Sequence, residues 1–97
     1  MATESQLRDT LRVHIRQQIE NGLLPVFIPE TIHAGYGAGI QCFACHQPIT
    51  PEQIEYEIED AEHLKRLRFH IGCHGLWQIE CGEWARRNMC AYRPSPD

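Results

Sequence analysis

The sequence has no long hydrophobic run, no excess of positive charge and no visible export signal. Its longest uninterrupted apolar runs are three or four residues, which excludes a transmembrane helix. The segment Met1–Gln6 lacks a basic region followed by an apolar stretch, so we expect a cytoplasmic protein. Nine Lys and Arg against thirteen Asp and Glu leave a formal charge of −4, which argues against a general nucleic-acid coat or a polybasic membrane anchor.

The chain is also short, yet it is rich in cysteine and histidine. Its 97 residues have room for a single hydrophobic core, so we expect one domain whose apolar core alone gives little stability. It contains five cysteines and six histidines. An odd number of cysteines without an export signal fits a disulfide framework poorly. This composition therefore indicates a metal site.

The first segment has the pattern of an amphipathic helix from about Thr3 to Asn21. Thr3 and Gln6 have the spacing of a capping box, and Asn21-Gly22 is a helix stop. Apolar residues recur every four positions and form a stripe that we expect to contact either the rest of the chain or a partner helix: Leu7, Leu11, Ile15 and Ile19. A basic stripe lies beside it, interpreted as a solvated flank or, alternatively, a partner-binding surface: Arg8, Arg12 and Arg16.

Three further elements follow from the pattern. The segment 23–39 is expected to be a glycine-rich linker with a short extended piece at Val26–Ile28, because two prolines exclude a helix. The alternation of apolar and charged residues from Ile54 to Phe69 predicts an antiparallel hairpin with cross-strand Glu–Arg pairs. A second helix is predicted over residues 73–88 by one face of regularly spaced residues: Cys73, Trp77, Cys81, Trp84 and Asn88.

The strongest signal is two short-spaced pairs of metal ligands, Cys42-Phe-Ala-Cys45 and, after twenty-four residues, His70-Ile-Gly-Cys73. Zinc favours four soft or borderline donors in a tetrahedron, and proteins supply them in such pairs. The hairpin between the two ligand pairs would bring the second pair close to the first. Cys73 would lie in the first turn of a helix, near the positive end of the helix dipole. The sequence therefore predicts one structural zinc ion bound by these four residues, with His74 as an alternative to His70.

A knuckle, a hairpin and a helix that carries the last ligand resemble a treble-clef zinc finger. The ligand pattern is most similar to the first zinc module of a LIM domain, and Ile49, Phe69 and Trp77 fit that resemblance. The resemblance covers about residues 40–84, and the second LIM module is missing. The chain is otherwise similar to short bacterial zinc proteins.

Pattern and resemblance together predict an α+β fold in one compact unit. Its parts are an N-terminal helix and linker (1–39), a zinc-binding treble-clef module of knuckle, hairpin and helix (40–90), and a loose tail (91–97).

No catalytic set is recognisable, so we do not expect an enzyme. A zinc deaminase needs His-x-Glu, and His33-Ala-Gly35 lacks the glutamate. The leading hypothesis is a protein-interaction or regulatory adaptor. One alternative is a nucleic-acid-binding regulator that uses the basic stripe with further arginines: Arg66, Arg68, Arg86 and Arg87. Another is a metal or redox sensor that uses Cys81 and Cys90.

Overall fold

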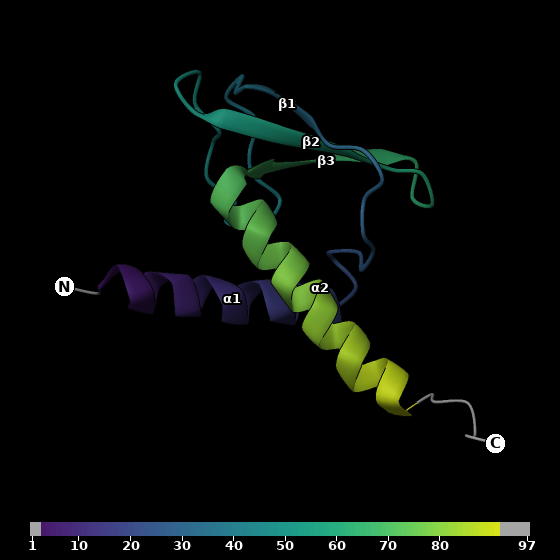
Figure 1. Ribbon diagram of the computed structural model, residues 1–97. Coiled ribbons are helices and arrows are strands. Elements are labelled where there is room, and N and C mark those ends of the chain that lie inside the picture. Colours follow the sequence, from purple (N-terminus) through teal and green to yellow (C-terminus); the bar gives the residue numbers. More distant parts are fainter. Residues whose placement is uncertain (1–2, 92–97) are drawn as a thin grey trace.

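Two helices and a three-stranded antiparallel sheet form the α+β fold that the sequence predicts (Figure 1). The computed structural model describes residues 3–91, with the side chains of 4, 5 and 89–91 outside this description. The elements, in chain order, are α1 (Glu4–Glu20), β1 (His33–Tyr36), β2 (Ile54–Asp60), β3 (Lys65–His70) and α2 (Ile71–Ala91).

Two sequence expectations concern the ends and the environment of the chain. The loose tail is expected at 91–97; Ala91 is the last residue of α2, and residues 92–97 lie outside the described residues. Neither helix of the described part is long and apolar enough to cross a membrane.

The predicted capping signals of α1 are both present. The Gln6 backbone N–H donates to Thr3 Oγ1 at 3.1 Å, and the Thr3 N–H donates to Gln6 Oε1 at 2.7 Å. Asn21 is the C-cap of the helix, and the next residue, Gly22, has a φ of 75°. Only glycine adopts that left-handed conformation without steric cost, which is why the chain leaves the helix here.

The predicted hairpin is formed by β2 and β3, with its apolar side against α2. Ile58 lies opposite Leu67, and Tyr56 lies opposite Phe69. Ile58, Leu67 and Phe69 have no exposed surface. Because side chains alternate between the two faces of a strand, this register places the glutamates of β2 and the arginines of β3 on the opposite face.

The charged face of the hairpin pairs across the strands as expected. Arg66 contacts Glu57 at 3.3 Å, and Arg68 contacts Glu55 at 3.7 Å and Glu57 at 3.5 Å. These arginines are therefore neutralised by their neighbours within the sheet.

The segment 23–39 differs from the expected linker because it contains strand β1. β1 pairs antiparallel with β2, and Ala34 lies opposite Tyr56. The extended piece expected at Val26–Ile28 is not part of the sheet. All four residues of β1 are exposed, so backbone pairing with β2, and not a buried apolar face, makes it a strand. A hydrophobic pattern could not have revealed it.

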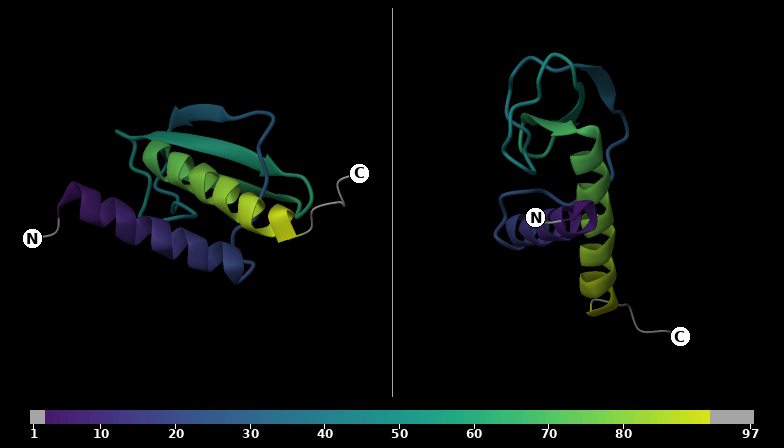
Figure 2. Two further views of the ribbon diagram at one scale, coloured as in Figure 1. Left: turned by 60° about the horizontal axis from the view of Figure 1, so that its bottom comes forward. Right: turned by 90° about the vertical axis from the view of Figure 1, so that its left-hand side faces the viewer.

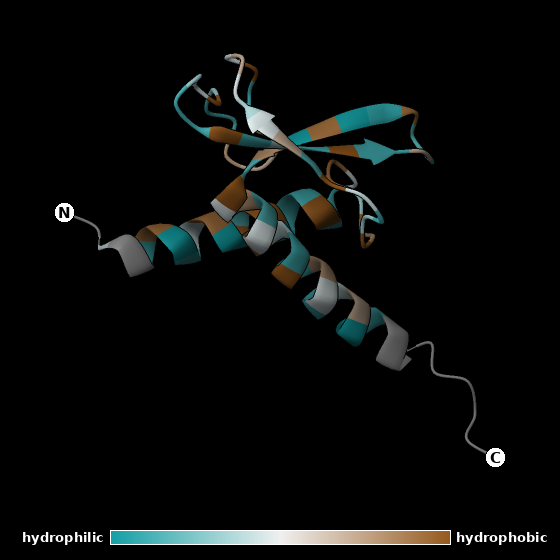
Figure 3. Cartoon of the chain, turned by 45° about the horizontal axis from the view of Figure 1, so that its top comes forward, coloured by the Kyte–Doolittle hydropathy of each residue, from teal (hydrophilic) through white to brown (hydrophobic). Residues whose placement is uncertain are grey.

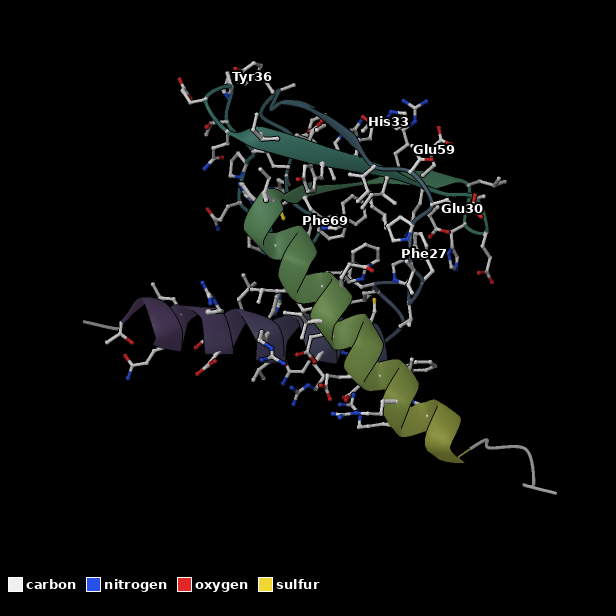
Figure 4. The ribbon with its side chains drawn as sticks, in the orientation of Figure 1. Phe27, Glu30, His33, Tyr36, Glu59 and Phe69 are labelled. Atoms are coloured by element: carbon white, nitrogen blue, oxygen red, sulfur yellow. The ribbon has the colours of Figure 1, made fainter. Side chains whose placement is uncertain are left out.

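The first turns of α2 pack against the sheet, and α1 crosses α2 further along its length (Figures 1 and 2). Phe69 lies between the sheet and α2 (Figure 4), and its ring stacks on Trp77 with ring centroids 4.8 Å apart. The Trp77 indole N–H donates to the Pro25 carbonyl at 3.0 Å, and the Gln78 side chain donates to the Phe27 carbonyl at 3.1 Å. These bonds hold the start of the linker against α2.

Gly37 is a position where the fold requires glycine. A Cβ there would collide with the carbonyl oxygens of Ile49 and Thr50. We expect Gly37→Ala to destabilise the protein by about 1–3 kcal/mol, measured by urea unfolding. Gly35→Ala is the matched control, because its Cβ meets nothing within 4 Å. Equal losses in both variants would contradict the prediction.

Candidate metal centre

The knuckle, the end of β3 and the start of α2 bring the two predicted ligand pairs together. The ligand atoms of Cys42, Cys45, His70 and Cys73 all lie within 4.8 Å of one another. His70 Nδ1 lies 3.4 Å from Cys45 Sγ and 3.8 Å from Cys73 Sγ. Tetrahedral zinc with ordinary bond lengths separates sulfur and nitrogen ligands by about 3.6 Å. The cluster could therefore hold one metal ion.

Backbone hydrogen bonds shape the knuckle. The Cys42 N–H donates to the Gln47 carbonyl at 2.9 Å, which closes the turn, and the Ala44 N–H lies 3.4 Å from Cys42 Sγ. The Phe43 N–H donates to the Arg68 carbonyl of β3 at 2.8 Å. The knuckle is thus attached to the strand that delivers the second pair of ligands.

The second pair lies where β3 passes directly into α2. His70 is the last residue of β3, and Cys73 is the third residue of α2. The first turn of a helix exposes backbone N–H groups and a partial positive charge, which would support the thiolate form of Cys73 once a cation is bound. The change from strand to helix therefore positions these two ligands.

Gln53 orients the imidazole of His70. Its Oε1 lies 3.1 Å from His70 Nε2 and also accepts the Thr50 N–H at 2.9 Å. An oxygen can only accept, so Nε2 carries the proton and Nδ1 presents its lone pair to the thiols. Sequence reasoning missed Gln53, because an outer partner of a ligand has no spacing rule that would identify it.

The three thiols strongly affect one another's ionisation. A hydrogen bond from Cys73 lowers the pKa of Cys42 to about 4. That bond and burial raise the pKa of Cys73, and burial raises the pKa of Cys45. The isolated cluster therefore favours one thiolate, and a bound cation would allow all three to ionise.

We expect acidification to release the metal and to unfold the segment that it holds. Protons compete with the cation for the thiolates and the imidazole, so metal content should fall between about pH 7 and about pH 4. The measurement is metal content after dialysis at each pH, with circular dichroism of the same samples. A chelator at neutral pH should have the same effect. Unchanged metal content at the acid end would contradict the prediction.

His74 is not part of the cluster. Its ring packs edge-on against Tyr56 and Trp77, with centroids 5.2 and 5.8 Å apart. Burial lowers its pKa and favours the neutral ring. Among the described residues, His70 and not His74 belongs to the four-residue group.

The cysteines proposed for a sensor lie elsewhere. Cys81 is buried, and its Sγ lies 3.8 Å from the Pro25 carbonyl oxygen. Burial raises the pKa of Cys81 to about 11, so the thiol stays protonated and unreactive. The side chain of Cys90 lies outside the described residues.

The apolar stripe of α1 divides into two halves. Ile15 and Ile19 are buried in the core shared with α2 and the knuckle, and Leu11 packs at its edge. Leu7 remains 60% exposed. The C-terminal half of the stripe therefore packs within the chain, and the N-terminal half is accessible.

Two arginines of the basic stripe bind a buried carboxylate in α2. Arg12 Nε donates to Glu80 Oε2 at 2.8 Å, and Arg16 Nε donates to Glu80 Oε1 at 2.9 Å. Glu80 is only 1% exposed. Arg8 is exposed. Arg12 and Arg16 thus connect the two helices and differ from the solvated flank that the sequence suggested.

No known protein family, characterised protein or solved structure matches this chain. The similarity to a LIM module therefore rests on ligand spacing and on the order of the elements. The fold and the cluster together define a small α+β protein with a Cys₃His group that could hold one metal ion.

Proposed function

We propose that this chain is a small structural-zinc protein that acts as a protein-interaction or regulatory adaptor. The chemistry of the four ligand atoms supports zinc as the metal. Three thiols and one imidazole are soft or borderline ligands, which favour zinc over calcium or magnesium. Four protein ligands complete a tetrahedron without water, so the zinc serves the fold and not a reaction.

The accessible half of α1 supports the adaptor role. Ion pairs from Arg12 and Arg16 to Glu80 attach the second half of α1 to α2, and the first half extends beyond this contact. Leu7 on α1 and Ile79 on α2 are 60% and 48% exposed. Exposed apolar residues on two neighbouring helices favour contact with a protein partner.

The charges of the chain disfavour the nucleic-acid alternative. Arg66 and Arg68 are paired with glutamates of the hairpin, and Arg12 and Arg16 share Glu80. The hairpin arginines are matched by an equal number of glutamates and contribute little to phosphate binding, and Arg12 and Arg16 together keep a single positive charge. The salt dependence of any duplex binding should then be shallow, at about one unit of log K per log salt for each remaining phosphate contact.

The test combines metal analysis with partner capture. The purified chain should contain about one zinc per molecule by mass spectrometry of the metal. Tagged chain in its native host should capture a protein partner that Leu7→Asp loses and Leu64→Asp retains. Leu64 is the matched control because it is 90% exposed on the hairpin turn. Capture of duplex nucleic acid in place of a protein would overturn the adaptor role.

A further inference from the structure

A groove of about 590 Å³ separates the first half of α1 from the first half of α2. Figure 3 shows hydrophobic residues on both helices where they approach each other. The helices cross further along, where Arg12 and Arg16 bind Glu80, so their first halves form the two walls of an open V (Figure 1). The wall residues that matter here are Leu7, Leu11, Leu76, Ile79, Gly72 and Gly75.

Two glycines leave the α2 wall without side chains. Gly72 and Gly75 are three residues apart and therefore lie on one face of the helix. A Cβ at either position would meet nothing within 4 Å, so internal packing does not require glycine there. Glycine within a helix costs about 0.5–1 kcal/mol relative to alanine. A bare helical surface is useful where another backbone must approach closely.

The α1 wall is basic in a chain whose overall charge is −4. Arg8 and Arg12 line the groove, and no acidic residue is among the described residues that line it. Arg12 and Arg16 share a single carboxylate, that of Glu80, so positive charge remains on this side. A complementary partner would be acidic.

The shape of the groove favours a helix as its occupant. Both walls are helices, and a third helix can pack its side chains into the space between them. The apolar side chains that line the groove span about one turn of each helix: Leu7 and Leu11 on α1, and Leu76 and Ile79 on α2. A partner helix would therefore contribute aliphatic residues at spacings of three and four.

We infer that the groove binds an amphipathic helix of a partner protein, with aliphatic residues facing Gly75 and carboxylates facing Arg8 and Arg12. This inference rests on the proposed adaptor function and specifies its partner. It also predicts that Gly72 and Gly75 serve binding and lower the stability of the protein relative to residues with higher helix propensity.

The test separates binding from stability with two matched substitutions. Gly75→Gln fills the groove, whereas Gly82→Gln adds the same side chain to the same helix outside it, also where a Cβ meets nothing within 4 Å. Glutamine is a good helix former, so both variants should raise the thermal midpoint. Only Gly75→Gln should weaken binding, by about tenfold or more.

The probes are peptides selected from a phage-displayed library of random sixteen-residue peptides against the zinc-loaded chain. We expect enriched sequences to combine aliphatic residues at helical spacing with Asp or Glu, and fluorescence anisotropy gives their affinities for each variant. Zinc content and circular dichroism confirm that both variants fold. Enrichment of basic peptides, no enrichment, or equal affinity for both variants would overturn the inference.

The experiment distinguishes failure of the proposed groove binding from failure of the proposed adaptor role. A natural partner that binds wild type and Gly75→Gln equally well would overturn the groove and leave the adaptor role intact. If the wild-type chain captured no protein partner, the adaptor role would fail, whatever the peptide affinities.

Discussion

Replacing Cys45 or Cys73 with serine is expected to abolish stoichiometric zinc binding and to unfold the segment from the knuckle through α2. Zinc binding by finger peptides is worth on the order of 10–16 kcal/mol, comparable to or larger than the whole stability of a small domain. The hairpin and α2 are joined to the knuckle through these ligands, so their packing depends on the site. Metal content by mass spectrometry and far-ultraviolet circular dichroism measure the two losses.

Cys81→Ala is the control for that experiment. Cys81 is buried like the ligands but is not part of the four-residue group. Cys81→Ala should lower the free energy of unfolding by about 1 kcal/mol through lost packing and leave zinc binding intact. Full zinc content and a native spectrum in Cys45→Ser would contradict the assignment of the site.

Removing both Arg12 and Arg16 is expected to destabilise the protein more than removing their shared partner. The Glu80 side chain has no exposed surface, whereas those of Arg12 and Arg16 are 33% and 39% exposed. A double substitution to methionine would leave a buried carboxylate without a counter-charge, which should lower the urea midpoint by about 1 M or more. Glu80→Gln leaves two arginines that can reach water, so this variant should lose less stability than the double variant.

The pH dependence gives this prediction a second measurement. Burial opposes ionisation of Glu80, but hydrogen bonds from Arg16 and Arg12 outweigh it and lower the pKa of Glu80 from its usual 4.5. A lowered carboxyl pKa stabilises the folded state above the unfolded value, and this contribution is lost as the pH falls through the folded value. The difference in free energy of unfolding between wild type and the double variant should therefore shrink below pH 4.5.

Arg86→Met is the control for the ion pair. Arg86 pairs with Glu83 on the exposed side of α2, where its side chain is 70% exposed. Exposed pairs contribute little, so this variant should unfold like wild type. A loss equal to that of the double variant would show that the Glu80 site has no special role.

Local chemistry was enough to determine several parts of this protein from its sequence. The ends of α1 follow from Thr3, Gln6 and Gly22, because caps involve residues only a few positions apart. The two faces of the β2–β3 hairpin follow from the alternation of apolar and charged residues, because a slip by one residue would move every apolar side chain to the wrong face. The ligand pairs follow from the two-residue gap that lets two donors reach one ion.

The tertiary structure alone decided how these parts are joined. Glu80 is 64 and 68 positions from its two arginines, and a chain with thirteen acidic residues offers many such partners. β1 forms because the backbone of β2 is available beside it, and Gln53 meets His70 because the hairpin returns there. The pairing of Glu80 with its arginines and the backbone pairing of β1 depend on what folding brings near, and neither follows from a periodic pattern in the sequence.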